Sequence, residues 1–484
     1  MMAFASSFSG VRAHWALEDD NVRWTSAELD AEIDALAERL RALNIAGPLA
    51  TLLDNSAAWV TIDRACVRAG IVHVPLPVFF TIEQVLHSLR AASAGAMLIE
   101  AMPADGRNGD LRVAGRELRV QRYAFDPVWL PTGTSKITFT SGTTGAPKGV
   151  CLSDAAMRRV ADSLVERLAP LGIGRHLCTL PLPVLLENIA GVLAPMEAGA
   201  TCIVRPLREL GLTGSSHFDP ALFDRAVRAH HAHSVVLLPQ MLRAWTRWLE
   251  ATGTSAPDAV RFVAVGGAAV GKGVLAAARA VGIPAYEGYG LSEGASVQTL
   301  NFPGADRAGS VGRPLPHASV RITADGEVEV TGSLYLGYIG ERSPQGGSWF
   351  ATGDLGTIDR DGYLHLQGRR KNVLVTAFGR NVSPEWVESV VGEHSAIRHA
   401  AVFGDGEPHL WAVLWPSDPS IDDATLQHAV EAANATLPDY ARIARWTRAA
   451  ASFDAASGLA TANGRPRREA IERLHAATIA SAAG

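Results

Sequence analysis

The order of hydrophobic and polar positions predicts that helices alternate with buried strands along most of the chain. Between residues 29 and 43, apolar side chains recur at steps of three and four, which places them on one face of a helix. Thr25 and Glu28 precede that face and form a capping box, a pattern that begins helices. Short apolar segments, typical of strands covered on both faces, occur at 71–78, 96–100, 200–204, 235–238 and 262–265.

The pattern changes after His317, where short strands are separated by turns. Asp325-Gly326 and Asp361-Gly362 are typical hairpin turns. Strands are predicted at 320–323, 327–331, 356–359 and 363–367. A charged break over residues 368–372, Gly-Arg-Arg-Lys-Asn, follows. We therefore expect a large domain over residues 1–370 and a small α+β domain over residues 371–484.

Length and composition narrow the class of protein. A chain of 484 residues that is 48% hydrophobic is long enough for at least two globular domains. The net charge of −5 gives no general attraction to nucleic acid or to anionic membranes. No run of about 20 apolar residues predicts a membrane span, and residues 1–10 lack the features of a signal peptide. We expect a cytoplasmic protein without nucleic-acid binding or stable membrane insertion.

The cysteine pattern adds to this picture. The four cysteines are scattered without CxxC spacing, at Cys66, Cys151, Cys178 and Cys202. The sequence alone therefore predicts reduced core residues, not zinc ligands or a disulfide framework.

Residues 140–149 carry the strongest chemical signal. They read Thr-Ser-Gly-Thr-Thr-Gly-Ala-Pro-Lys-Gly and follow an apolar strand at 136–139. Glycines let several backbone N–H groups point at one anion, hydroxyls bond phosphate or Mg²⁺, and Lys148 adds positive charge. The order differs from a Walker A loop, in which Gly-Lys-Ser/Thr opens a helix. Taken alone, the stretch is either a phosphate-binding loop or a polar surface turn.

Two later motifs carry groups suited to a nucleotide. Tyr289-Gly290-Leu291-Ser292-Glu293 follows an apolar strand expected to end near Ala285. The tyrosine face can stack on adenine, the glycine permits close approach, and the carboxylate can hold Mg²⁺. Asp354, expected at a strand end, can accept hydrogen bonds from both hydroxyls of a ribose. Each motif alone is equally compatible with an ordinary turn that carries an exposed acid.

Together and in this order, these motifs resemble the adenylate-forming superfamily, which includes acyl-CoA synthetases, luciferases and peptide-synthetase adenylation domains. The resemblance implies an α/β fold. Its large N-terminal domain would contain two α/β subdomains and a small β-barrel, and a mobile C-terminal lid would follow. It also implies ATP, Mg²⁺ and CoA, or the phosphopantetheine of an acyl carrier protein, as reaction partners.

The same resemblance assigns roles to residues. Lys148, Glu293, Lys371 and Arg465 would be catalytic, with Lys371 as the pivot of the lid, and Glu293 and Thr140 would hold the metal. Gly379 would lie on the loop that lines the entry of the thiol. The nucleotide contacts would be Thr140, Ser141, Gly142, Thr143, Thr144, Gly145, Glu287, Gly288, Tyr289, Gly290, Ser292, Asp354 and Arg369.

Arg465 departs from the pattern of the superfamily, which usually carries a catalytic lysine at that place. No lysine follows Lys371, and the whole chain contains only four. Arginine keeps the positive charge that a phosphoryl transition state needs, so we expect an active ligase. The alternative is a degenerate protein that binds an adenylate without forming it.

The acyl pocket is predicted around residues 180–191, a mostly apolar stretch. No acid in it is placed to hold an α-ammonium group, so we expect a non-amino carboxylic acid, fatty sooner than aromatic. Glu187 in this stretch is either a structural partner or a gate. The sequence leaves open whether the acceptor is CoA or a carrier protein. The substrate contacts would be Val184, Leu185, Leu186, Asn188, Val265, Gly266 and Gly267, with Gly379 toward the thiol.

Overall fold

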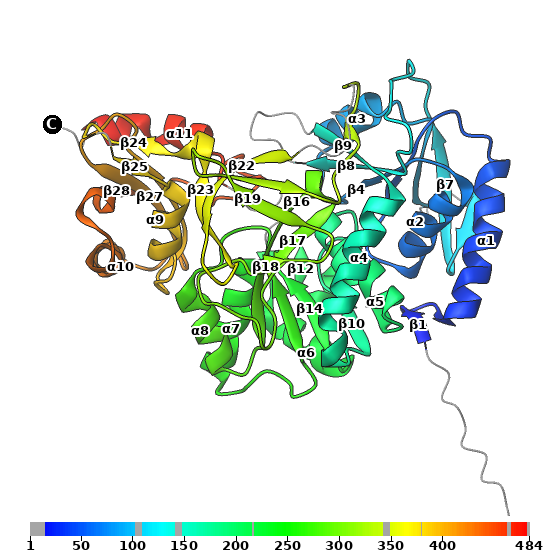
Figure 1. Ribbon diagram of the computed structural model, residues 1–484, viewed down its shortest axis with the longest axis horizontal. Coiled ribbons are helices and arrows are strands. Elements are labelled where there is room, and N and C mark those ends of the chain that lie inside the picture. Colours follow the sequence, from blue (N-terminus) through cyan, green and yellow to red (C-terminus); the bar gives the residue numbers. More distant parts are fainter. Residues whose placement is uncertain are drawn as a thin grey trace, which may run out of the picture.

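The computed structural model describes residues 15–101, 109–140, 148–214, 217–341, 349–378, 380–461 and 466–481. Within these residues, two large mixed sheets lie side by side in the N-terminal part of the molecule (Figure 1). The first sheet has the order β21 (Gly337–Tyr338), β9 (Lys148–Leu152), β8 (Lys136–Thr140), β4 (His73–Leu76), β3 (Leu49–Leu52), β5 (Ala96–Glu100), β7 (Arg116–Arg122) and β6 (Leu111–Val113). The second has the order β18 (Arg313–Pro314), β17 (Ser296–Leu300), β16 (Ala285–Leu291), β15 (Phe262–Val265), β14 (Ser234–Leu237), β10 (Arg175–Cys178), β11 (Thr201–Val204), β1 (Trp15–Glu18) and β2 (Arg23–Thr25).

The central strands of both sheets are parallel, with β3 between β4 and β5 in one sheet and β14, β15 and β16 adjacent in the other. Helices cross between them, as parallel connections require. The described N-terminal helices are α1 (Ser26–Ala42), α2 (Ala57–Ala69), α3 (Ile82–Ala91), α4 (Asp154–Leu168), α5 (Ala194–Glu197), α6 (Pro220–Ala229), α7 (Pro239–Thr252) and α8 (Lys272–Ala280). The expected α/β layering is confirmed.

Local signals in the sequence place several of these elements. Thr25 and Glu28 form the predicted capping box of α1, and the predicted face of that helix is buried from Leu29 to Leu40. The apolar segments expected as strands coincide with β5, β11, β14 and β15 to within about one residue.

Residues after His317 form an antiparallel sheet of four described strands, in the order β19 (Ser319–Ile322), β20 (Glu327–Thr331), β22 (Phe350–Ile358) and β23 (Leu364–Arg369). The two predicted hairpin glycines, Gly326 and Gly362, have φ angles of 81° and 83°, which a turn of this kind requires. The hydrogen bonds among the described residues join these four strands into one antiparallel sheet.

The C-terminal part carries a three-stranded sheet, β26 (Ile397–Phe403), β27 (Leu410–Pro416) and β28 (Ile443–Arg448), a short hairpin, β24 (Leu374–Val375) and β25 (Asn381–Val382), and the helices α9 (Pro384–Val391), α10 (Asp423–Thr436) and α11 (Arg468–Ser481). It lies at one end of the molecule, opposite α1 (Figure 1). It meets the N-terminal part through polar contacts. Arg243 donates to the Gly392 carbonyl at 3.3 Å, and Glu393 accepts from the Gly273 amide at 3.2 Å.

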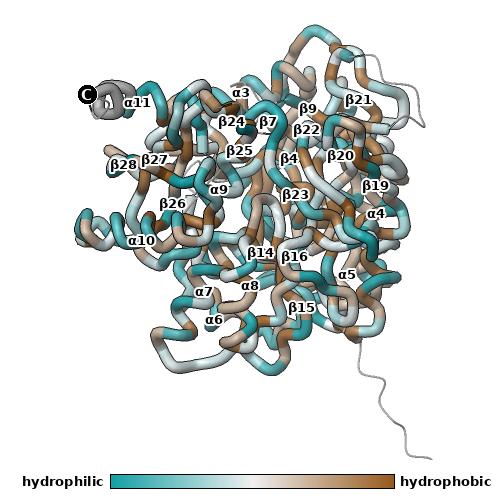
Figure 2. Tube along the Cα trace, turned by 60° about the vertical axis from the view of Figure 1, so that its left-hand side comes forward, coloured by the Kyte–Doolittle hydropathy of each residue, from teal (hydrophilic) through white to brown (hydrophobic). Residues whose placement is uncertain are grey.

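Hydrophobic stretches run through the interior strands, and hydrophilic stretches lie along outer elements such as α11 (Figure 2). Trp59 and Trp245 are the largest fully buried side chains in the described part. Among the helices described, none is both long enough and apolar enough to cross a membrane.

Candidate active site

A cavity of about 1630 Å³ opens where the two large sheets, the four-stranded sheet and helix α9 meet. Most of the described residues that the sequence assigned to a site line it. They are Lys148, Val184, Leu185, Leu186, Val265, Gly266, Gly267, Glu287, Gly288, Tyr289, Gly290, Ser292, Glu293, Asp354, Arg369 and Lys371. Residues from six separate stretches of the sequence therefore line one cavity.

The remaining assigned residues do not all share that placement. Thr140 ends strand β8, and Ser141, Gly142, Thr143, Thr144 and Gly145, together with Gly379 and Arg465, lie outside the described residues. Asn188 is buried and is not among the residues that line the cavity. Its side chain accepts a hydrogen bond from Lys136 instead, which gives it a structural place.

Tyr289, Asp354 and Arg369 converge on one wall of the cavity. The Asp354 carboxylate accepts from the Tyr289 hydroxyl at 2.6 Å and pairs with Arg369 Nε at 2.6 Å. Asp354 and Arg369 are direct partners in the β22–β23 register. Burial and the neighbouring Asp354 charge raise the pKa of Tyr289 well above its usual value, so this hydroxyl stays a donor. The wall thus presents a carboxylate, a guanidinium and an aromatic face together.

Two strand boundaries differ from the sequence prediction. Strand β16 runs from Ala285 to Leu291, so Tyr289 lies within it and not in a loop beyond it. Asp354 lies in the middle of β22 and not at a strand end. Both strands contain glycines, which in a sequence are typical of turns, so the sequence did not indicate the true ends of the strands. A Cβ at Gly290 would collide with the Ser296 carbonyl of the neighbouring strand, so this glycine is required by the β16–β17 pairing itself.

Glu293 and Lys148 are linked through Tyr338, which the sequence analysis did not single out. The Tyr338 hydroxyl donates to Glu293 Oε1 at 2.8 Å, and Lys148 Nζ lies 5.2 Å from the centre of the Tyr338 ring. Strand β21, which contains Tyr338, pairs with β9, which begins at Lys148. One carboxylate and one lysine ammonium therefore flank the same tyrosine at the edge of the cavity. A lone aromatic after Gly337 gives no signal of this role in the sequence.

Glu287 is a buried acid in the wall of the cavity. Its Oε1 accepts from the Val270 amide at 3.1 Å. Burial raises the pKa of Glu287 to about 7. The side chain therefore changes its charge close to neutral pH.

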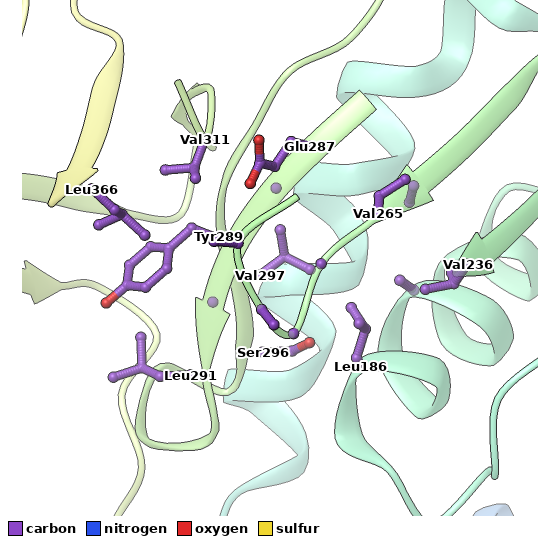
Figure 3. A pocket seen from close by; sticks show the side chains of 18 of the residues that line it. Leu186, Val236, Val265, Glu287, Tyr289, Leu291, Ser296, Val297, Val311 and Leu366 are labelled. Atoms are coloured by element: carbon purple, nitrogen blue, oxygen red, sulfur yellow. The ribbon is translucent and has the colours of Figure 1, made fainter. Parts of the chain in front are cut away.

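Another part of the cavity lining is apolar. Leu186, Val236 and Val265 lie together on one side of strand β16, and the Tyr289 ring points to the opposite side, toward Leu291 and Leu366 (Figure 3). The apolar lining continues along α4, the short helix after it, the π-helix η3 (Glu187–Leu193) and α5. These lining residues are Leu164, Val165, Leu168, Ala169, Ile173, Ala190, Ala194, Pro195 and Ala198. The geometry combines a polar wall with an apolar branch.

A buried ionic network lies behind this branch. Lys136 pairs with Asp63 at 2.8 Å and donates to Asn188, while Asp63 also accepts from His73 at 2.7 Å. Arg64 lies 3.2 Å from the same carboxylate. Burial alone would raise the pKa of Asp63, but Lys136 and Arg64 hold it well below its usual value. The network joins β8, which leads to the predicted phosphate loop, to the helix that lines the apolar branch.

The C-terminal part contributes further lining residues that sequence reasoning missed. Pro466 and Arg468 line the cavity, and so do Trp386 and Glu388 of α9. Arg468 is held by Glu388, with nitrogen–oxygen distances of 2.6 and 2.8 Å. The sequence predicted that Arg468 is a solvated surface charge. It gave no sign of the acidic partner, because Glu388 lies about 80 residues earlier in the chain.

Comparisons with known proteins agree on one family. The model of the family described as AMP-binding enzyme matches residues 4–341, and that of the AMP-binding enzyme C-terminal domain matches residues 371–483.

Individual relatives cover most of the chain at modest identity. The chain is 27% identical over 488 residues to the long-chain-fatty-acid–CoA ligase FadD15 of Mycobacterium bovis, covering 86% of this chain and 81% of the relative. It is 29% identical over 431 residues to a feruloyl-CoA synthase of an Amycolatopsis species, covering 82% and 84%. A solved structure of O-succinylbenzoate coenzyme A synthetase from Bacillus subtilis, in complex with ATP and magnesium ion, superimposes with a TM-score of 0.75. It is 24% identical and covers 96% of this chain and 97% of that one.

Proposed function

This chain belongs to the AMP-binding enzyme family, and from that premise we propose that it is an ATP-dependent acid–thiol ligase of the acyl-CoA synthetase type. The carboxylate of an apolar acid would attack the α-phosphate of ATP, giving an acyl-adenylate and pyrophosphate. The thiol of CoA would then displace AMP. The observation that carries the proposal is the single cavity in which a charged wall meets an apolar branch.

The wall offers groups for each part of the nucleotide. Asp354 and Arg369 would bind the ribose, and the Tyr289 ring would contact the adenine. Lys148 would meet the phosphates. Holding the two reactants in line removes most of the entropic cost of their encounter, which can contribute ~7–11 kcal/mol.

Glu293 fits the Mg²⁺ that relatives use, because it is a carboxylate that lines the cavity and is oriented by the Tyr338 hydroxyl. Magnesium would supply positive charge against the phosphate oxygens. The chain itself supplies Lys148 on the other side of Tyr338.

The apolar branch supports a fatty or other apolar acid as substrate. The relatives include a long-chain-fatty-acid–CoA ligase, a feruloyl-CoA synthase and a 2-succinylbenzoate–CoA ligase, so acid–thiol ligation is common to them while the acid differs. In this chain Leu186, Val236 and Val265 give this part of the branch an apolar lining. Each buried methylene can contribute up to ~0.8 kcal/mol, about a fourfold change in KM.

Exchange of labelled pyrophosphate into ATP, measured across short-, medium- and long-chain fatty acids, aromatic acids and amino acids, tests the substrate class. We expect KM to fall with chain length until the branch is full. Ala190→Phe, which narrows the branch, should move the preference to shorter acids, while Ala276→Phe on the exposed face of α8 should not. Best exchange with an amino acid would contradict the proposal.

The acceptor is tested by adding CoA or a phosphopantetheinylated carrier protein to the preformed adenylate. We propose CoA as the acceptor, and faster release of AMP with the carrier protein would favour the alternative.

A second candidate, a degenerate adenylate-binding protein, rests on Arg465, which stands where the superfamily usually carries lysine. We favour catalysis by Arg465, because its neighbours Pro466 and Arg468 line the cavity. Arg465→Ala should slow exchange and leave thioester formation from a supplied acyl-adenylate nearly intact, and Arg465→Lys should keep or raise the rate. Exchange by Arg465→Lys but not by the parent would identify the parent as the degenerate binder.

A further inference from the structure

Three potential metal ligands meet in the wall of the apolar branch. His176 and Cys178 come from β10, and Glu187 begins the π-helix η3. His176 Nε2, Cys178 Sγ and a Glu187 carboxylate oxygen all lie within 4.8 Å of one another, and all three side chains are buried. A second thiol, Cys202 of β11, lies next to the cluster, with its Sγ 3.4 Å from that of Cys178.

Two polar atoms of this cluster lack a hydrogen-bond partner in the described structure. They are His176 Nε2 and Glu187 Oε2, both fully buried. His176 Nε2 is 3.6 Å from Glu187 Oε1, which is too long for a hydrogen bond. A buried polar atom without a partner costs about 1–3 kcal/mol. Each of these two atoms could therefore give an electron pair to a bound ion.

Neighbouring groups orient the cluster as they would orient metal ligands. The Ser234 hydroxyl contacts His176 Nδ1 at 2.8 Å, which leaves Nε2 facing Glu187. The Thr179 amide donates to Glu187 Oε1 at 2.9 Å. Gly191 keeps the space clear, because a Cβ there would collide with Glu187 Oε1 and lie 3.0 Å from His176 Nε2. A π-helical turn of the kind that begins at Glu187 often marks a functional site.

We propose that His176, Cys178 and Glu187 form a zinc site with three protein ligands. Imidazole, thiolate and carboxylate are zinc's usual ligands in proteins. In a tetrahedral zinc site, bond lengths of about 2.0–2.1 Å place nitrogen and oxygen ligands about 3.4 Å apart. The distance of 3.6 Å between His176 Nε2 and Glu187 Oε1 is close to this value.

The charges also suit a divalent ion. The Cys178 thiolate and the Glu187 carboxylate balance the ion, which avoids the large cost of an unpaired charge in a dry interior. The site would tie β10 to η3, and neighbouring residues of η3 line the apolar branch. Its role would be to fix the shape of the acyl pocket, because it would hold η3 against the sheet.

Zinc analysis of the full chain tests the proposal. Tag-free protein, purified from zinc-supplemented culture and gel-filtered, should retain about one zinc ion per chain by mass spectrometry of the elements. Cys178→Ser and Glu187→Gln should each lose most of it. Cys151→Ser, which changes another buried cysteine outside the cluster, should retain it.

A spectroscopic measurement on the parent protein avoids the possibility that a variant fails to fold. The ligands are buried, so the ion must enter during folding, and cobalt is therefore supplied in the growth medium. We expect a thiolate-to-cobalt charge-transfer band and the visible bands of tetrahedral cobalt. Folded parent protein that binds ATP but retains neither zinc nor cobalt would overturn the proposal, as would a Cys178–Cys202 disulfide in peptide mapping. Both readouts are independent of ligase activity.

Discussion

The Asp354 carboxylate shows how much a single residue organises in the candidate site. It accepts a hydrogen bond from Tyr289 and pairs with Arg369, so it fixes both neighbours. We propose that it also binds the ribose. Its position in the middle of β22, directly opposite Arg369, makes this arrangement rigid.

We expect Asp354→Ala to weaken the binding of ATP and AMP by about 1–3 kcal/mol, or roughly 5- to 150-fold in Kd, because charged hydrogen bonds to the ligand are lost. Isothermal titration calorimetry measures this. The matched control is Asp361→Ala, since Asp361 also pairs with an arginine but lies on an exposed turn. Equal affinity of Asp354→Ala and the parent would remove Asp354 from the nucleotide site.

Glu287 gives a second prediction at this scale, in the dependence of stability on pH. Burial raises its pKa to about 7 in the folded chain, against 4.5 for the unfolded value, so the folded state binds the proton more tightly. The stabilisation is fully present below pH 4.5 and is lost as pH rises through about 7. At about 1.4 kcal/mol per pKa unit, the loss is on the order of 3 kcal/mol.

Glu287→Gln cannot ionise, so the free energy of unfolding of this variant relative to the parent should rise between pH 5 and pH 8. Urea titrations at the two pH values measure the difference. A difference between variant and parent that stays constant with pH would show that the Glu287 pKa is not raised.

At the scale of elements, the ionic network around Asp63 connects parts that are far apart in sequence. Lys136 at the start of β8 contacts both Asp63 of α2 and Asn188 of η3. The sequence analysis placed Lys136 only at the start of the apolar strand 136–139, because nothing local reveals a partner 73 residues earlier. Its burial explains why arginine, with its larger planar fork, would not fit as well.

We expect Lys136→Met to lower the free energy of unfolding by about 3–5 kcal/mol, because it removes one partner of a buried ion pair and disturbs the balance of the network. Lys272→Met, at an exposed lysine, should change it by at most about 0.5 kcal/mol. Chemical denaturation monitored by circular dichroism provides the comparison. If the two variants proved equally stable, the network would not contribute to folding.

At the scale of the whole molecule, the C-terminal part closes one side of the cavity through residues such as Trp386 and Arg468. Its described contacts with the N-terminal part include the polar pairs Arg243–Gly392 and Gly273–Glu393. Polar interfaces of this kind within a chain permit relative motion of domains. Lys371, within the short helical turn Arg370–Asn372 at the junction, lines the cavity.

We predict that Lys371→Pro slows thioester formation more than adenylate formation, since proline restricts the backbone rotation that a moving lid needs. Pyrophosphate exchange reports the first step, and release of AMP from a supplied acyl-adenylate on addition of CoA reports the second. Lys371→Ala separates the loss of the side chain from the loss of backbone freedom. An equal reduction of both steps in Lys371→Pro would argue against a hinge at this residue.

The sequence by itself determined the family, the α/β layering and a set of site residues, most of which line the cavity where the structure describes them. Periodicity and capping reflect local geometry, and a motif such as residues 289–293 keeps its chemistry wherever the strand ends.

The tertiary structure decided which distant groups meet. It placed Tyr338 between Lys148 and Glu293, turned Asn188 toward Lys136, and brought His176, Cys178, Glu187 and Cys202 together from two strands and a helix. Cys178 and Cys202 show no CxxC spacing, because they belong to neighbouring parallel strands and are 24 positions apart in the sequence. Such contacts depend on packing between elements, which no local pattern encodes.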